Sequence, residues 1–330
     1  MKTSMRYFLW LSAFLALTSF SPSHLQAQSA LKKIRMSLPP KNVAYLAIYL
    51  ARNKGLYKQE GIDLELILMP ANLASTAVLS GDLDYNGAVT GVIGAAVLER
   101  PIKALIFTVA RPLEFLMTKK EIKELRQLKG KKIAGSSPGG TVTMLTRVVL
   151  RNLGLDPERD AFLNPMGGTG AGRLAALDSG VVDAAILEMP ENILAQQRGY
   201  NELLFLGDFV EFPQNGFGAS ERKIRESPDE VLKMVRATLR GLHFIWEEKN
   251  HEEVLDIIMK EWKIADRKMA GETFKHLKRV LTRDASVKPE SVQFLIDVIR
   301  ENSKVTRPVT VAQVVDYTFV EKARKESGSR

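Results

Sequence analysis

From residue 31 onward, short apolar runs alternate with longer segments in which apolar residues recur at helical spacing. A short apolar or β-branched run predicts a buried strand, whereas spacing of three and four residues predicts an amphipathic helix. Strands are predicted at residues 33–38, 63–68, 83–86, 104–109, 132–134, 162–165, 182–187, 203–206 and 216–220. Helices are predicted between them at 42–52, 72–80, 92–99, 122–128, 141–152, 170–178 and 191–197. This alternation favours an α/β fold with a largely parallel sheet.

Two stretches of this pattern, 99 residues apart, share the motif A-x-x-S-G-x-x-D. Residues 77–84 read AVLSGDLD and residues 176–183 read ALDSGVVD. In each, we expect a helix to end at the serine, the glycine to turn the chain, and the aspartate to lie in the next buried strand. The order of flanking elements also agrees, so the sequence predicts two lobes of similar α/β build.

After residue 220 the pattern becomes helical, with predicted helices at 229–246, 251–261, 266–281, 289–301 and 313–324. Ser227 is the expected N-cap of the first of these, Pro228 its first helical residue and Glu230 the partner in a capping box. We expect these helices to pack on the first lobe. The predicted organisation is therefore a targeting segment (1–28), a first lobe (30–112), a second lobe (113–212), and a return to the first lobe with the C-terminal helices (213–330). Two extended crossings, near 110–115 and 210–216, would form a hinge.

The first 28 residues have the pattern of a cleavable signal peptide. Lys2 and Arg6 precede an apolar run at 8–20, which is too short to span a bilayer as a helix. Cleavage after Ala27 places a leucine at the −3 position, and cleavage after Ser29 places an alanine there. The mature protein is thus expected to be secreted, and periplasmic in a double-membraned bacterium. An uncleaved membrane anchor is the alternative.

Composition narrows the chemistry. The chain has no cysteine, which excludes thiol catalysis, cysteine-based zinc sites, iron–sulfur clusters, disulfides and a lipid anchor on cysteine. Its net charge is +9, but the basic residues are interspersed with acids, so nucleic-acid binding is not favoured. A half match to a calcium loop at 82–87 has Ile93 where the bidentate glutamate belongs. No cofactor and no metal are expected.

Ligands of open α/β sheets bind beyond the carboxyl ends of the strands, where helices begin. Four loops at such positions are rich in small or hydroxyl residues: 39–42 (PPKN), 87–91 (GAVTG), 135–141 (GSSPGGT) and 167–172 (GGTGAG). Small residues let the backbone approach a ligand, and hydroxyl groups donate hydrogen bonds to it. These loops are the predicted ligand site. The alternative for each is a helix cap and tight turn without a ligand.

Two of these loops also match other motifs. Residues 135–139 fit G-x-S-x-G, the nucleophile elbow of hydrolases, but Pro138 lacks the N–H that would build the oxyanion hole. The mature chain has only His243, His251 and His276, all in predicted helices rather than on a loop after a late strand. Loop 167–172 resembles a dinucleotide fingerprint only loosely, and no G-K-[ST] completes a phosphate loop.

Taken together, residues 33–220 resemble a known family of exported proteins. The resemblance rests on ARNKGLYKQEGID (51–63), LSGDLDY (79–85), LKGKKIAGSSPGGT (128–141) and AALDSGVVDAA (175–185). These motifs are similar to those of the periplasmic substrate-binding proteins of nitrate, sulfonate and taurine-type ABC importers, with their relatives that bind thiamine-precursor pyrimidines. The resemblance implies a type 2 periplasmic-binding fold, a ligand held between two lobes, and an ABC permease with its ATPase as partner. We also expect the protein to be a monomer.

The resemblance also implies which residues face the ligand: Pro39, Pro40, Asn42, Asn72, Thr90, Ser136, Ser137, Thr141, Gly168, Thr169 and Glu188. Glu188 follows a predicted strand, where a specificity group would lie, although it could equally be a surface acid before Pro190. Tyr45, Phe115 or Phe212 could be aromatic platforms for a ligand, or core residues.

The function predicted from the sequence is that of a solute-binding protein rather than an enzyme. An enzyme on the same scaffold, such as a small-molecule lyase or hydrolase, remains an alternative and would need a titratable pair in the cleft. A ligand-sensing domain of a receptor system is a second alternative. The ligand's charge stays open, because helix N-termini suit an anion whereas Glu188 opposes one.

Overall fold

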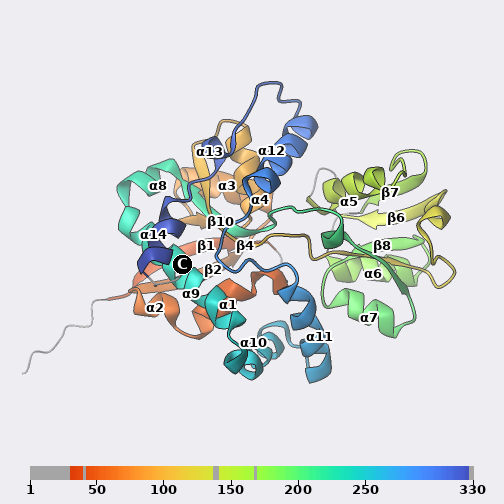
Figure 1. The fold of residues 1–330 in the computed structure, drawn as a ribbon, viewed down its shortest axis with the longest axis horizontal. Helices are drawn as coiled ribbons and strands as arrows, with labels where there is room; N and C mark the ends of the chain where they lie inside the picture. Colours follow the sequence, from red (N-terminus) through yellow and green to blue (C-terminus); the bar gives the residue numbers. More distant parts are fainter. Residues whose placement is uncertain (1–29, 40–41, 137–140, 167–168, 327–330) are drawn as a thin grey trace, which may run out of the picture. The chain divides into compact units, whose positions relative to one another are not determined.

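A computed structural model describes residues 30–39, 42–136, 141–166 and 169–326 (Figure 1). The described residues from Leu31 onward form one compact unit. Within the described residues, the strands form two five-stranded sheets with helices on their faces. The α/β class predicted from the sequence is confirmed. None of the helices in the described ranges is both long enough and apolar enough to cross a membrane.

The first sheet, sheet A, has the strand order β2-β1-β3-β10-β4. Its strands are β1 (Lys32–Leu38), β2 (Ile62–Leu68), β3 (Tyr85–Asn86), β4 (Ile102–Val109) and β10 (Asn215–Ser220). The strands β2, β1 and β3 are parallel, and β10 runs antiparallel to β3 and β4. Nearly every residue of β4 is buried, as expected for a strand covered on both faces.

The second sheet, sheet B, has the strand order β7-β6-β8-β5-β9. Its strands are β5 (Phe115–Thr118), β6 (Lys131–Gly135), β7 (Ala161–Pro165), β8 (Ala184–Leu187) and β9 (Asn201–Phe205). Three strands are again parallel, followed by β5, which is antiparallel to β8 and β9. The two sheets therefore have the same arrangement. Strand β5 was not predicted, because the sequence analysis assigned its start to a crossing.

The shared sequence motif has the same backbone role in both sheets. Gly81 and Gly180 both follow a helix and have φ values of 93° and 75°. These values lie in the left-handed region that favours glycine, so each glycine ends its helix and redirects the chain. The predicted turn is confirmed at both positions.

The aspartates of the motif precede their strands rather than lying in them. Asp84 donates its N–H to the carbonyl of Arg35 on β1, and its Oδ2 accepts from the Arg35 N–H at 2.8 Å. Asp183 does the same with Lys132 on β6, its Oδ2 lying 3.1 Å from the Lys132 nitrogen. Each carboxylate thus continues the strand pairing by one residue, which is the physical reason for an aspartate at this place.

Helices connect and cover the strands. In and around sheet A they are η1 (Val43–Tyr45), α1 (Leu46–Asn53), α2 (Leu56–Gln59), α3 (Ala71–Ser80) and α4 (Val89–Val97). Between β5 and β9 lie η2 (Leu125–Leu128), α5 (Thr141–Asn152), α6 (Gly170–Asp178) and α7 (Glu191–Gln197), and η3 (Leu206–Asp208) follows β9. These elements lie together in yellow and green in Figure 1.

After β10 the chain is helical, as the periodicity predicts. The helices are α8 (Glu221–Glu226), α9 (Pro228–Trp246), η4 (Glu248–Asn250), α10 (His251–Trp262), α11 (Arg267–Lys278), α12 (Pro289–Ser303), α13 (Val311–Val314) and α14 (Thr318–Glu326). Helix α9 packs on α1, α2 and α14, and α12 packs on α4. Helices α9, α12, α13 and α14 therefore extend the core of sheet A, whereas His276 on α11 packs against Phe115 and Phe205 of the second sheet's strands.

The capping box predicted for α9 is wrong. Ser227 is the N-cap residue, but its side chain makes no cap hydrogen bond. Glu230 is 8% exposed and instead pairs with Lys223 at 2.6 Å and accepts a hydrogen bond from the Tyr85 hydroxyl at 3.0 Å. Lys32 is a further ion partner of this carboxylate. Tertiary partners thus outweigh the local cap.

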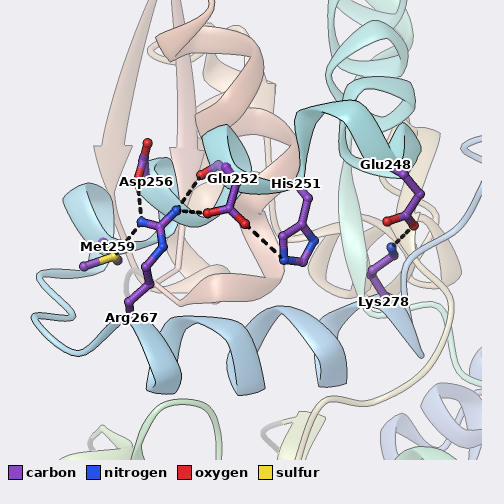
Figure 2. A network of polar contacts seen from close by, with 7 residues as sticks. All are labelled: Glu248, His251, Glu252, Asp256, Met259, Arg267 and Lys278. Atoms are coloured by element: carbon purple, nitrogen blue, oxygen red, sulfur yellow. Dashed lines mark hydrogen bonds and ion pairs between the residues drawn. The ribbon is translucent and has the colours of Figure 1, made fainter.

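An exposed network joins α10 to α11 (Figure 2). Arg267 on α11 contacts Asp256 at 2.7 Å and also pairs with Glu252. Glu252 in turn lies 3.9 Å from His251. Because these side chains are solvated, each pair contributes little, and the contact between the helices depends mainly on their buried apolar faces.

Two extended segments cross between the sheets, one before β5 and one before β10. Phe212 donates its N–H to Ala110 and Gln214 donates to Val109, each at 3.0 Å. Arg111 pairs with Glu211 at 2.7 Å. The crossings therefore run beside each other and are hydrogen-bonded.

Candidate functional site

A small recess lies where both sheets and both crossings meet. It has about 190 Å³ of atom-free space, including the open space at its mouth. The enclosed room inside it is only about 10 Å³, about what one water molecule needs, so the recess in this structure fits no more than one small polar group of a ligand. Its lining residues are Asn42, Val43, Ala44, Leu113, Glu114, Glu188, Met189 and Gln214.

The strands of both sheets direct side chains to this recess. Asn42 follows β1 and caps η1, with its Oδ1 accepting from the Ala44 N–H at 2.9 Å. Glu188 follows β8 directly. Both positions are carboxyl ends of parallel strands, as expected for ligand sites in α/β proteins. The recess therefore brings together two predicted residues that are 146 positions apart in the sequence.

Glu188 is held by a buried arginine from α6. The Arg173 Nη2 lies 2.8 Å from Glu188 Oε2, and the Arg173 Nε donates to the Ile186 carbonyl at 2.6 Å. Arg173 is 2% exposed, whereas the Glu188 side chain is 22% exposed. A buried guanidinium needs such partners, and here they fix the position of the carboxylate.

The first turn of α6 also faces carboxylates. Thr169 is its N-cap and accepts from the Gly172 N–H at 3.4 Å. A Cβ at Gly170 would lie 2.8 Å from Glu188 Oε2 and 3.1 Å from Glu191 Cδ. Glycine thus lets two carboxylates approach the positive end of the helix. Burial raises the pKa of Glu191, and the Glu188 carboxylate raises it further.

Glu114 is the buried acid of the recess. It is 2% exposed, its Oε1 accepts from the Gln214 Nε2, and its Oε2 has no hydrogen-bond partner among the described residues. The pKa of Glu114 is raised to about 8, mainly by burial and also by the nearby Glu188 carboxylate, while Gln214 and Arg173 oppose the shift. This carboxyl therefore carries a proton over much of the neutral range.

Gln214 connects Glu114 to the other crossing. Its Oε1 accepts from the Leu113 N–H at 3.2 Å, while its Nε2 donates to Glu114. Tyr45, which hydrogen-bonds with Asn215, lies close enough to Glu114 for the carboxylate to raise the pKa of Tyr45, although burial is the larger cause. Glu114, Gln214 and the Leu113 N–H thus form one hydrogen-bonded chain across the two crossings.

Four other residues predicted to face the ligand are described by the structure but do not line the recess. Thr90 lies in the first turn of α4 and not in a loop, because α4 begins at Val89 and not at 92 as predicted. Ser136 follows β6, and its Oγ lies 3.2 Å from the Thr143 Oγ1. Pro39 follows β1 and is partly buried, and Thr169 is exposed. None of these four lines the recess.

Pro40, Ser137 and Gly168 lie outside the described residues. Asn72 is the second residue of α3 and Thr141 is the first residue of α5, but their side chains also lie outside the description. Their predicted contacts with a ligand stay predictions.

The predicted aromatic platforms are core residues. Phe115 and Phe212 are both 0% exposed, and Tyr45 is 3% exposed. Phe115 packs against Phe205, and Phe212 packs against Phe294. The alternative given above for these three aromatic residues, that they belong to the core, is therefore confirmed.

Glu114 and Gln214 were missed by the sequence analysis. A signal was present in the sequence, since Glu114 is a charged residue flanked by the apolar Leu113 and Phe115 in a predicted crossing, and Gln214 has the matching place in the second crossing. No group of three or more potential metal ligands occurs within the described ranges.

Comparison with known proteins places this geometry in a family. The chain is 21% identical over 318 residues to YtlA of Bacillus subtilis, which carries the name of a binding protein, covering 93% of this chain and 94% of YtlA. The periplasmic aliphatic sulphonate-binding protein SsuA of Escherichia coli has a similar structure, with a TM-score of 0.68, 17% identity and coverage of 86% of this chain and 92% of SsuA.

An enzyme also has this fold. The desulfurization enzyme DSZB is similar in structure, with a TM-score of 0.63, 16% identity and coverage of 90% of this chain and 99% of DSZB. The periplasmic-binding fold predicted from the sequence is confirmed by these structures. The family model described as NMT1/THI5 like matches residues 42–251, more than half of the chain. The protein therefore belongs to the NMT1/THI5-like family.

Proposed function

We propose that this protein is an extracytoplasmic solute-binding protein that captures a small organic ligand and delivers it to an ABC importer. The observation that carries the proposal is the recess, to which both sheets and both crossings contribute polar residues. The family membership and the similarity to binding proteins such as SsuA support it. The ligand would occupy the recess with one group and contact the loops after β6 and β7 with the rest.

In this proposal the two sheets are the cores of two lobes. Lobe 1 comprises residues 30–112 with the return at 213–330, and lobe 2 comprises residues 113–212. A ligand that contacts Asn42 on one side and Glu188 on the other stabilises the arrangement in which both are near. Binding would then select a closed state through its extra contacts, and the permease would recognise that state.

The partner, location and oligomeric state are part of the proposal. We infer an ABC permease with its ATPase as partner, a monomer in solution, and a periplasmic location reached through a cleaved signal peptide covering about residues 1–28. The periplasmic location of SsuA supports the last point. N-terminal sequencing of the secreted protein would identify the cleavage site.

The binding function is tested by thermal unfolding of the mature protein with a panel of amines, sulfonates, pyrimidines and amino acids. A ligand at 100 times its Kd should add about 2.7 kcal/mol to the free energy of unfolding. Small-angle scattering should show compaction with the same ligand. The variant Asn42→Ala should reduce both effects. If no compound in the panel changes either measurement, the transport proposal is wrong.

An enzyme on this scaffold is the second candidate. The titratable pair that it requires is present as Glu114 and Glu188, and Glu114 holds a proton near neutral pH, as a general acid would. Mass spectrometry of a bound ligand after long incubation distinguishes the two functions. Product that forms with the wild type and not with Glu188→Gln would support the enzyme, whereas an unchanged ligand supports a binding protein.

A further inference from the structure

We propose that the recess is selective for a small organic cation, an ammonium or amidinium group, which binds between Glu114 and Glu188, and that Glu114 releases its proton when the cation binds. This inference rests on the proposed binding function and names the ligand class of the same site. It follows from the charges and unpaired atoms of the recess.

The first argument is the charge inventory. The recess contains two carboxyl groups, and none of the eight lining residues that the structure describes is basic. Arg173, outside the lining, is buried and already bound to Glu188 and to the carbonyl of Ile186. Among the described residues, one guanidinium therefore accompanies two carboxyl groups at the recess, and a ligand with a positive charge would balance them. A further anion would add to the repulsion between the carboxyl groups.

The second argument is the unpaired oxygen of Glu114. A buried acceptor without a hydrogen bond is costly, and a structure rarely keeps one without a reason. Gln214 holds the other carboxyl oxygen, so Oε2 is the oxygen that remains for a ligand. An N–H of a cation would satisfy it with a charge-assisted hydrogen bond. The Glu188 side chain, which is 22% exposed, can accept from a second N–H of the same group.

The third argument concerns the helix end. In related folds a helix N-terminus can serve an anion, and α6 is the helix whose first turn lies at Glu188. Here that turn already faces the carboxylates of Glu188 and Glu191, which lie against Gly170. The positive end of α6 therefore stabilises carboxylates of the protein itself, and an anionic ligand would have to displace them.

Proton release follows from the same contacts. The charged groups that act on Glu114 are the Glu188 carboxylate after β8 and the Arg173 guanidinium from α6, with the neutral Tyr45 of η1 nearby. Because burial raises the pKa of Glu114 to about 8, the free protein at pH 7 holds a proton there. A cation at Oε2 favours the ionised form. Affinity should therefore rise as the pH increases toward 8, by up to about tenfold per pH unit.

The test uses two sets of probes that share a skeleton and differ in charge: acetamidinium, acetamide and acetate, and benzamidinium, benzamide and benzoate. Titration calorimetry of the mature protein at pH 7, in buffers of different ionisation enthalpy, gives both affinity and proton release. We expect the amidinium of each set to bind at least about tenfold more tightly than its neutral and anionic counterparts, with nearly one proton released.

The variant Glu114→Gln keeps the size of the side chain and removes its charge. We expect it to bind the amidinium probes at least about tenfold more weakly and without proton release. Glu202→Gln is the matched control, because burial also raises the pKa of Glu202 but this residue does not line the recess. The control should bind like the wild type. Thermal unfolding of both variants verifies that they are folded.

The outcomes separate the two proposals. Tighter binding of acetate, benzoate or the neutral amides than of the amidinium probes would refute the cation inference while preserving the binding function. Amidinium binding without proton release, or equal binding by Glu114→Gln, would refute the role of Glu114. If neither these probes nor the broad panel bind, the binding function itself is wrong, and this inference fails with it.

Discussion

Replacing Arg173 by leucine tests whether a buried ion pair positions the acid of the recess. Leucine keeps much of the apolar contact of the side chain but removes the guanidinium. Glu188 then loses the partner at 2.8 Å, and the Ile186 carbonyl loses its donor at 2.6 Å. Removing one partner of a buried pair costs about 3–5 kcal/mol. The lower end applies here, because the Glu188 side chain is 22% exposed and water can reach it.

We therefore expect Arg173→Leu to lower the free energy of unfolding by about 3 kcal/mol, measured by urea denaturation followed by far-UV circular dichroism. Arg225→Leu is the control, since the side chain of Arg225 is 68% exposed and its pair with Glu221 spans 3.9 Å. Its effect should be below about 1 kcal/mol.

The double variant Arg173→Leu with Glu188→Leu separates charge from packing. Because it removes both charges, it should recover most of the stability lost in Arg173→Leu. If the free energy of unfolding of Arg173→Leu instead lies within about 1 kcal/mol of the wild-type value, the ion pair does not hold Glu188 in place. If the double variant is less stable than the single variant, packing rather than charge explains the loss.

Four further variants test other parts of the structure. Gly216→Ala should lower the free energy of unfolding, measured by urea denaturation, by at least about 3 kcal/mol, because the added Cβ would overlap a carbonyl oxygen of β4. Gly271→Ala should raise it by about 0.5–1 kcal/mol, because no atom lies within 4 Å of the added Cβ. Lys223→Met should lower the free energy of unfolding by about 3 kcal/mol, because buried Glu230 then keeps only an exposed lysine as ion partner; an unchanged urea midpoint would contradict this. For Glu114, a pKa of about 8 in the native state means that the unfolded chain loses this proton near pH 4.5 and the native protein does not. Urea unfolding curves at several pH values should show the free energy of unfolding of the wild type falling by about 3–5 kcal/mol relative to that of Glu114→Gln as the pH rises from about 4.5 to 8. Below about pH 4.5 the gap between the two proteins should not change with pH.

Much of the fold could be predicted because local signals mark its elements. The helices at 141–152, 170–178 and 191–197 have the predicted bounds, since glycine, threonine and proline lie at their ends. Strand β5 was missed because its pairing with β8 and β9 is entirely non-local and antiparallel. No local pattern distinguishes such a strand from an apolar crossing.

The site was predictable in part, for the same reason. Asn42 and Glu188 follow strands, so the general location of ligands in α/β proteins predicts them. Glu114 follows no parallel strand, and its importance arises from burial and from its hydrogen bond with Gln214, 100 positions later in the chain. The failed capping box at Glu230 has a similar origin, because Lys223 and the Tyr85 hydroxyl determine where that carboxylate lies.

The position of Glu114 links the charge of a ligand to the connection between the two sheets. Its Oε1 accepts from Gln214, and Gln214 also holds the Leu113 N–H, so this one carboxyl joins the two crossings. An ionised carboxylate accepts a stronger hydrogen bond than a protonated carboxyl does. A cation that ionises Glu114 would therefore strengthen the contact between the crossings at the moment of binding. An anion would keep the proton in place and leave that contact in its weaker form. The same residue that selects the ligand would thus stabilise the closed arrangement, without a separate element to transmit the signal.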